Sequence, residues 1–181
     1  DSEITDRQLV FKLGGLFSHK PAFFLAWTTT PWAFPGNPHL AIATDVEYAV
    51  VELENDCLIL AKTLLEHVGL DGYKVVDTLK GSELVSATYE PLFNPHKYGV
   101  ERRRPQAFVS HEVMHTRTEL QLQEPNKNLS YHVIAADFVS TEEGTGIVHV
   151  APAYGEVDFE AMLSNEPKVD FVHMVNLEGK V

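Results

Sequence analysis

Residues 22–32 read Ala-Phe-Phe-Leu-Ala-Trp-Thr-Thr-Thr-Pro-Trp, which joins an apolar run to a dense group of hydroxyls. The apolar part, residues 22–29, predicts a buried strand, because a short continuous apolar segment bounded by a breaker is typical of a sheet interior. Pro31 ends this strand, since proline has no N–H to donate to a ladder. Three threonines then lie between two tryptophans, each of which is a large rigid wall with one N–H. We therefore expect a pocket where the strand ends.

The composition is that of an ordinary globular chain. Its 181 residues are 44% hydrophobic and 22% charged, as in a single domain with a sizeable core. We therefore expect residues 1–181 to form one domain, excised from a longer protein because the chain begins at Asp1 without a signal-peptide pattern. No apolar run approaches the ~20 residues of a membrane span. The single cysteine, Cys57, fits a buried structural thiol in a reducing compartment, so we expect a cytoplasmic location.

The charge balance limits the partners that the chain can bind. Fourteen basic residues face 26 acidic ones, and the formal net charge is −12. Extended, sequence-tolerant binding of nucleic acid requires many phosphate contacts, so this class is disfavoured. Contact with one nucleotide or with a short RNA end stays compatible with the charge. We interpret the densest basic group, residues 97–104, as a solvated loop.

The remaining pattern is β-rich with short helices. Apolar or alternating segments between turn residues predict strands over residues 40–44, 48–53, 57–60, 73–78, 131–140, 147–150 and 170–175. Helical spacing predicts helices over residues 62–68, capped by Gly69, and 154–163. Residues from about 91 to 130 have weak periodicity and are interpreted as a loop-rich insertion. Many short strands at near-regular spacing favour a barrel or sandwich with peripheral helices.

A second informative segment, residues 144–159, reads GTGIVHVAPAYGEVDF. The predicted strand ends at Pro152, and Asp158 would lie in the first turn of the following helix, where the helix dipole favours a carboxylate. His149 lies near the end of the strand, so the strand–turn–helix brings both side chains to one end of the sheet. A carboxylate in a recess suits a cationic group such as an ammonium. The alternatives are a simple helix-terminus charge for Asp158 and a core imidazole for His149.

Taken together, the two segments resemble a known family. The string WTTTPW followed by Pro35 and Asn37, combined with GTGIVHVAPAYGEVDF, is similar to the editing (CP1) domain inserted in isoleucyl-tRNA synthetase, a class I aminoacyl-tRNA synthetase. The resemblance spans about residues 22–45 and 131–160, with compatible order and spacing between them.

This chain also differs from its relatives at informative positions. The valyl and leucyl enzymes usually carry an Arg-Pro step after the threonines, whereas Thr30-Pro31-Trp32 stands here, which favours the isoleucyl enzyme. Ala33 and Phe34 replace a Thr-Leu pair that the family commonly has. Residues 91–125 match no pattern of the family, and nothing is transferred to them.

The resemblance implies a fold, a reaction and partners. The fold is β-rich α+β, with a closed six-stranded β-barrel core and peripheral short helices. The reaction is post-transfer editing, in which the ester bond of misacylated Val-tRNA(Ile) is hydrolysed. The implied partners are the 3′ terminal adenosine of tRNA(Ile), the valine moiety and the rest of the parent synthetase, with no membrane. No cofactor is implied for this domain, since ATP, magnesium and any zinc would belong to the rest of the parent enzyme.

The resemblance also implies roles for individual residues. Asp158 would bind the α-ammonium of the aminoacyl group, and His149 would exclude isoleucine by its bulk. Thr28, Thr29 and Thr30 would supply hydroxyls and backbone groups to the ester and the attacking water.

Two further residues are implied to bind the substrate: Trp32 as a wall of the pocket, and Asn37 as a hydrogen-bonding partner of the adenosine or the ester. No residue resembles a covalent nucleophile beside a base, so direct attack by water is favoured.

Three other functions fit parts of the sequence. The chain could be the editing domain of the valyl enzyme, acting on Thr-tRNA(Val), or a non-catalytic module that binds RNA or a protein partner. Residues 111–115 read His-Glu-Val-Met-His, the signature of zinc proteases. The preceding residues lack an amphipathic helical pattern, and only the distant Glu142 or Glu143 offers a third ligand. We therefore expect no metal.

Overall fold

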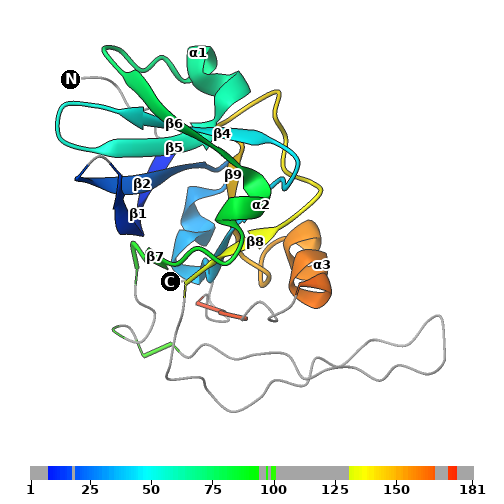
Figure 1. Ribbon diagram of the computed structural model, residues 1–181. Coiled ribbons are helices and arrows are strands. Elements are labelled where there is room, and N and C mark those ends of the chain that lie inside the picture. The colour runs from blue at the N-terminus through cyan, green and yellow to red at the C-terminus, as the bar shows by residue number, and fades with distance from the viewer. Residues whose placement is uncertain are drawn as a thin grey trace, which may run out of the picture.

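The computed structural model describes residues 8–17, 19–93, 97, 99–100, 131–165 and 171–174. The strands in these ranges are β1 (Gln8–Phe17), β2 (Lys20–Trp27), β3 (His39–Ile42), β4 (Glu47–Glu52), β5 (Cys57–Ala61), β6 (Lys74–Lys80), β7 (Tyr89–Glu90), β8 (Val133–Ala135) and β9 (Ile147–Val150). The α-helices are α1 (Leu65–Val68), α2 (Gly81–Leu84) and α3 (Glu156–Ser164), and the 3₁₀ helices are η1 (Pro31–Gly36) and η2 (Lys62–Leu64) (Figure 1).

Strand β2 is the centre of the sheet. Strand β1 pairs with it antiparallel, while β5 pairs in parallel with its first half, and β9 pairs in parallel with its last residue, Trp27, through Val148. Strand β3 lies antiparallel to β9 and parallel to β8. Because β2 and β9 meet at Trp27, the threonines after β2 come close to the segment that follows β9. The two segments quoted from the sequence therefore adjoin in space.

The predicted closed six-stranded barrel is wrong. Within the described residues the sheet contains nine strands of mixed direction, and seven of them follow an open path, β6-β4-β5-β2-β9-β3-β8, that curls into a half-barrel. Strands β1 and β7 lie off this path, and the region of β7 meets that of β8 through an isolated bridge between Thr88 and His132. Strand spacing indicates how many strands exist, but pairing and register depend on turns and on packing between distant segments. Closure was implied by the resemblance, and strand spacing alone cannot specify it.

Most predicted elements are confirmed. Strands β2 to β6 and β9 lie where the apolar pattern places them, and the helix before Gly69 forms as η2 followed by α1. Gly69 has φ of 69°, the left-handed conformation expected of a glycine cap. Helix α3 corresponds to the helix predicted for residues 154–163.

Other elements differ from the predictions. The strand predicted for residues 131–140 is much shorter, since β8 ends at Ala135 and the chain turns at Asp137. In residues 171–174, only Phe171 has a bridge conformation, so no extended strand forms there. Strands β1 and β7 and helix α2 were not predicted. Most of the predicted insertion, including residues 101–130, lies outside the described residues.

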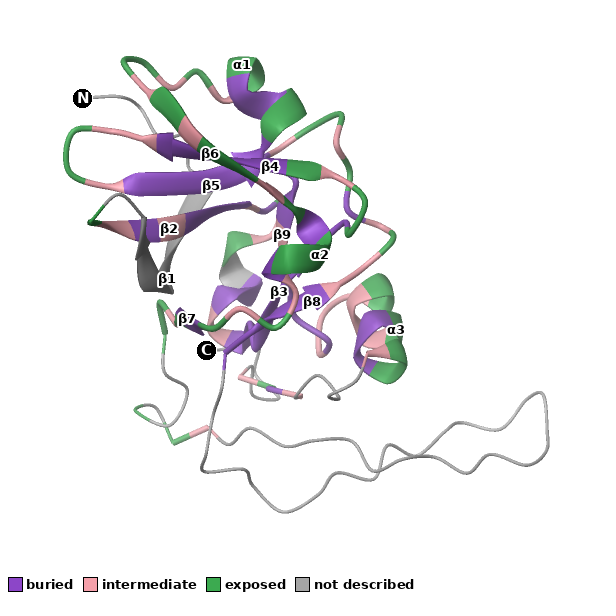
Figure 2. Cartoon of the chain, in the orientation of Figure 1, coloured by how far each residue is buried: buried purple, intermediate pink, exposed green. Residues whose placement is uncertain are grey.

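The main core lies between the curled strands and beneath α2, as the buried residues in Figure 2 show. It includes Cys57, which is fully buried, as a structural thiol should be. Tyr48 is also fully buried, and its hydroxyl donates to the carbonyl of Gly146 at 2.7 Å and accepts from the N–H of Ala43 at 3.1 Å. Tyr48 thereby fixes the turn that precedes β9. Among the described helices, none is long and apolar enough to cross a membrane.

Candidate functional site

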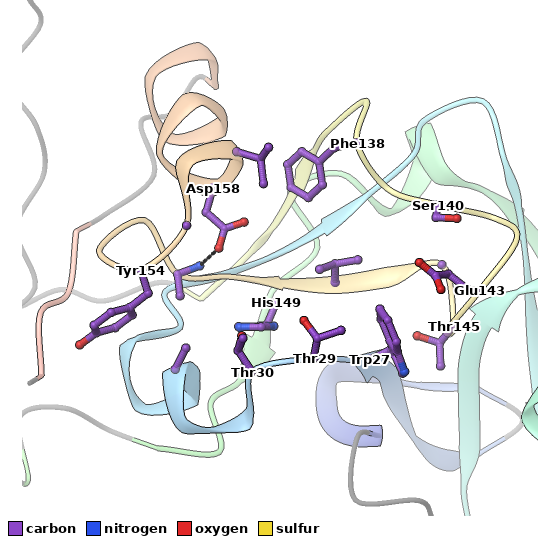
Figure 3. Close-up of a pocket in the computed structure, with 16 residues that line it drawn as sticks. Trp27, Thr29, Thr30, Phe138, Ser140, Glu143, Thr145, His149, Tyr154 and Asp158 are labelled. Carbon is purple, nitrogen blue, oxygen red and sulfur yellow. Dashed lines mark hydrogen bonds between the residues drawn. The ribbon is translucent and has the colours of Figure 1, made fainter. Parts of the chain in front are cut away.

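A recess of about 330 Å³ opens where β2 and β9 end. Its lining includes both segments that the sequence singled out, and Figure 3 shows the strand β9 running between the threonine side and the carboxylate side. The lining includes Trp27, Thr29, Thr30, Ala33, His149 and Asp158. A volume of this size lies at the lower end of the range for small-molecule sites.

The three consecutive threonines have different environments. Thr29 is exposed and Thr30 is half-buried, and both line the recess. Thr28 is 1% exposed, lies outside the lining, and accepts a hydrogen bond from the Thr30 N–H through its Oγ1 at 3.0 Å. This local bond stabilises the turn that leaves β2. Thr28 therefore shapes the backbone, while Thr29 and Thr30 present their groups to the recess.

The other two predicted substrate-binding residues follow in η1 and just after it. The side chain of Trp32 lies outside the described part of the structure. Asn37 is 8% exposed and does not line the recess; instead its Oδ1 accepts a hydrogen bond from the Val150 N–H at 3.3 Å. Asn37 thus links the end of η1 to the end of β9, which holds the two walls of the recess together.

His149 is a buried wall of the recess. Its side chain is 5% exposed and its ring stacks on Phe34, with centroids 4.9 Å apart and an interplanar angle of 21°. The Nδ1 atom is buried without a hydrogen-bond partner among the described residues. Burial lowers the pKa of His149 from 6.5 to about 4, because the charged imidazolium would lose its hydration. At neutral pH the ring is therefore uncharged and acts as a bulky apolar surface.

Asp158 lies in the first turn of α3, as predicted. Its Oδ2 accepts a hydrogen bond from the Ala151 N–H at 2.8 Å, which turns the carboxylate toward the end of β9. Burial raises the pKa of Asp158, and the bond from Ala151 partly opposes this effect. No lysine, arginine or histidine forms an ion pair with Asp158 in the described residues. Within the described residues the carboxylate thus has no cationic partner, and a cationic ligand would restore the favourable environment that burial removes.

Several lining residues were missed by the sequence analysis: Phe138, Ser140, Glu143 and Tyr154. Phe138 and Ser140 were predicted to be part of a strand, but they lie in the turn region after β8. Glu143 lies in the turn region before β9, and the approach of this turn to Trp27 depends on long-range strand pairing. A Cβ on Gly144 would lie 2.9 Å from the Trp27 ring, and φ of 72° also favours glycine there.

No group of three or more histidine, cysteine, aspartate or glutamate side chains is placed to hold an ion within the described residues. The His-Glu-Val-Met-His string at residues 111–115 lies outside the described residues.

The curated relatives that resemble this chain include isoleucine–tRNA ligases. No family profile matches the chain. It is 41% identical over 164 residues to an isoleucine–tRNA ligase of Dehalococcoides mccartyi strain CBDB1, covering 91% of this chain and 15% of the relative. It is 40% identical over 158 residues to the isoleucine–tRNA ligase of Clostridium novyi, covering 87% of this chain and 12% of that relative. The chain thus spans about one seventh of the length of these relatives or less.

Solved structures with a similar fold include a structure titled as a CP1 domain and editing domains of leucyl-tRNA synthetases. A structure titled GlLeuRS-CP1 superposes with a TM-score of 0.62 at 13% identity, over 86% of this chain and 57% of that chain. The editing domain of the cytosolic leucyl-tRNA synthetase of P. knowlesi gives a TM-score of 0.57 at 10% identity, over 84% and 60% of the two chains. At this level of identity the similarity establishes the fold, which is the curled mixed sheet of these CP1 domains.

Proposed function

Since this chain belongs to the isoleucine–tRNA ligase family as its CP1 editing domain, we propose that it hydrolyses the ester bond of misacylated Val-tRNA(Ile). The rest of the parent enzyme and the tRNA would be its partners. Isoleucine and valine differ by one methylene, and the isoleucyl enzyme is the standard example of a binding site that gains only about 1–3 kcal/mol of discrimination from it. A second, hydrolytic site that accepts only the smaller side chain corrects the remaining errors.

The observation that carries this proposal is the pairing of Asp158 with the Thr29–Thr30 wall in one recess. An aminoacyl ester carries an α-ammonium a few bonds from the carbonyl that must be attacked. Asp158 offers a half-buried carboxylate for the ammonium, and its bond from Ala151 fixes the direction in which it points. The threonine side chains and the backbone at the end of β2 lie across the recess, where they can hydrogen-bond the ester and a water molecule.

The chemical step is a direct hydrolysis. A water oxygen attacks the ester carbonyl carbon, the carbonyl electrons move to its oxygen, and the bond to the ribose oxygen then breaks. The proton lost by water ends on the ribose oxygen, so the products are valine and tRNA with a free hydroxyl. Hydrogen bonds from the Thr29 and Thr30 region would stabilise the developing oxyanion and orient the water. A neighbouring ribose hydroxyl of the substrate could assist in the proton transfer.

His149 would set the upper limit on the size of the acyl group. Its uncharged, buried ring forms a fixed part of the wall, and fixed walls reject an extra methylene by overlap rather than by lost attraction. A pKa of about 4 makes the imidazole a poor proton acceptor, which argues for a steric role over general-base catalysis.

The test is a single-turnover deacylation assay with the chain and radiolabelled Val-tRNA(Ile) or Ile-tRNA(Ile). We expect release of valine to be much faster than release of isoleucine. Asp158→Asn should slow valine release about 10- to 100-fold, since it removes a charge-assisted bond to the ammonium. Glu160→Gln, which makes the same chemical change on the exposed face of α3, should have no effect. Binding without release of valine would indicate a silent module and contradict the proposal.

A further inference from the structure

The His149 ring stacks on the ring of Phe34. A buried histidine is normally oriented by a hydrogen bond to one of its ring nitrogens. His149 has no such bond to any described residue, and its Nδ1 is buried and unpartnered. Its ring contact is instead the near-parallel stack on Phe34, with centroids 4.9 Å apart. The stack therefore supplies the orientation that a hydrogen bond would otherwise give.

The backbone around Phe34 is unusually constrained. Phe34 lies in η1 between Pro31 and Pro35, which fix their own φ angles. Its carbonyl accepts a hydrogen bond from the Asn37 N–H at 2.9 Å, and the Asn37 side chain in turn accepts from Val150 on β9. Phe34 itself is only 4% exposed. This arrangement holds the phenyl ring against β9, where His149 resides, with little freedom to move.

Phe34 does not line the recess, whereas its neighbour Ala33 and its stacking partner His149 both do. Because His149 lines the recess, a change in the tilt of its imidazole would change the shape of the recess. The position of the wall thus depends on a side chain that the substrate never contacts.

We propose that Phe34 is a positioning residue for acyl-group selectivity: by stacking on His149 it fixes the wall that excludes the larger ester. This inference rests on the function proposed above. It assigns the size limit to a pair of residues, Phe34 and His149, instead of to the histidine alone.

The experiment compares Phe34→Leu with Phe24→Leu as a matched control. Phe24 is also a fully buried phenylalanine, but it packs edge-on against Tyr89 in the main core, away from the recess. Deacylation of Val-tRNA(Ile) and Ile-tRNA(Ile) gives the selectivity ratio for each variant. In parallel, NMR titration of ring protons follows the pKa of His149, with its signal assigned from a His149→Gln variant. If Phe34→Leu does not fold, Phe34→Met serves as the second variant.

We expect Phe34→Leu to lower the ratio of the valine to the isoleucine deacylation rate roughly two- to tenfold. This range is the factor that corresponds to the loss of one aromatic pair. The pKa of His149 should rise because its ring gains access to water, and Phe24→Leu should change neither quantity. Unchanged selectivity in Phe34→Leu, or an equal loss in Phe24→Leu, would overturn the inference.

The two proposals fail in different ways. If the wild-type chain releases neither amino acid, the editing proposal itself fails and the selectivity role of Phe34 falls with it. If valine is released selectively but Phe34→Leu leaves the pKa of His149 measured by NMR unchanged, only the role of Phe34 is rejected.

Discussion

Asp158 Oδ2 accepts a hydrogen bond from the Ala151 N–H at 2.8 Å, and this bond joins the first turn of α3 to the end of β9. The carboxylate is consequently both a structural acceptor and the negative group of the recess. These two roles can be separated by mutation, because an asparagine keeps an oxygen acceptor while it loses the charge.

We predict that Asp158→Ala destabilises the fold and that Asp158→Asn does so much less. Ala151 is only 1% exposed, and in the alanine variant its N–H loses its acceptor. A buried unpaired donor costs about 1–3 kcal/mol. Both variants should lose deacylation activity. Urea denaturation measures the difference in unfolding free energy. Equal stability of the two variants would show that the bond to Ala151 contributes little.

A second prediction concerns the unequal threonines. Thr28→Val should lower the unfolding free energy by about 1 kcal/mol, since it removes the oxygen that accepts the Thr30 N–H. Thr29→Val, at an exposed position, should leave stability nearly unchanged but slow deacylation. Thermal unfolding and the deacylation assay together separate the two effects. The proposed difference between Thr28 and Thr29 is wrong if Thr28→Val is as stable as the wild type and Thr28→Ser is no more stable than Thr28→Val.

A third prediction follows from the buried imidazole. The folded pKa of His149 is about 4 and the unfolded value is 6.5, so between these pH values the unfolded chain binds a proton that the folded chain does not. The contribution of neutral His149 to the unfolding free energy is therefore fully present above pH 6.5, and it is lost as the pH falls toward 4. Urea denaturation at pH 7.5 and pH 5 should show a loss of about 2 kcal/mol from this residue alone.

The same titration in His149→Gln provides the control, because other groups also titrate in this range. The pH-dependent loss should be about 2 kcal/mol smaller in this variant. An identical loss in both proteins would show that the histidine does not stay neutral in the fold.

A fourth prediction concerns the turn that precedes β9. The fully buried hydroxyl of Tyr48 donates to the Gly146 carbonyl and accepts from Ala43, and desolvation raises the pKa of Tyr48 to about 12. Tyr48→Phe should lower the unfolding free energy by about 1–3 kcal/mol, because the buried N–H of Ala43 and the carbonyl of Gly146 lose this partner. Tyr73→Phe, at a half-buried position outside this network, is the matched control. Denaturation midpoints measure the difference, and equal midpoints for the two variants would show that the Tyr48 hydroxyl does not stabilise this turn.

The sequence predicted the strands of the sheet more reliably than their arrangement. Apolar runs such as residues 57–60 and 147–150 identify buried strands directly, and Gly69 marks a helix end by its conformational freedom. Closure could not be inferred, since it depends on which distant edges pair. Here β2 divides its partners between β5 and β9, and no local pattern encodes that division. Strand β7 has only two residues, too few for any periodicity.

The candidate site was predicted in outline. Thr29, Thr30, His149 and Asp158 do meet in one recess, because the strand–turn–helix pattern is local and the threonine string is distinctive. The structure gives Thr28 and Asn37 hydrogen bonds to the backbone in place of positions in the lining, a distinction that only side-chain direction reveals. Phe138 and Glu143 enter the recess through turns whose geometry the sequence does not specify.

The central claim is that the recess between the threonine wall and Asp158 binds the aminoacylated end of the tRNA. The most direct measurement is a crystal structure of the chain with a non-hydrolysable valyl-adenosine analogue. We expect the ammonium of the ligand within about 3 Å of an Asp158 carboxylate oxygen, with the valine side chain against His149. A ligand bound elsewhere, or bound here with its ammonium directed away from Asp158, would contradict the account.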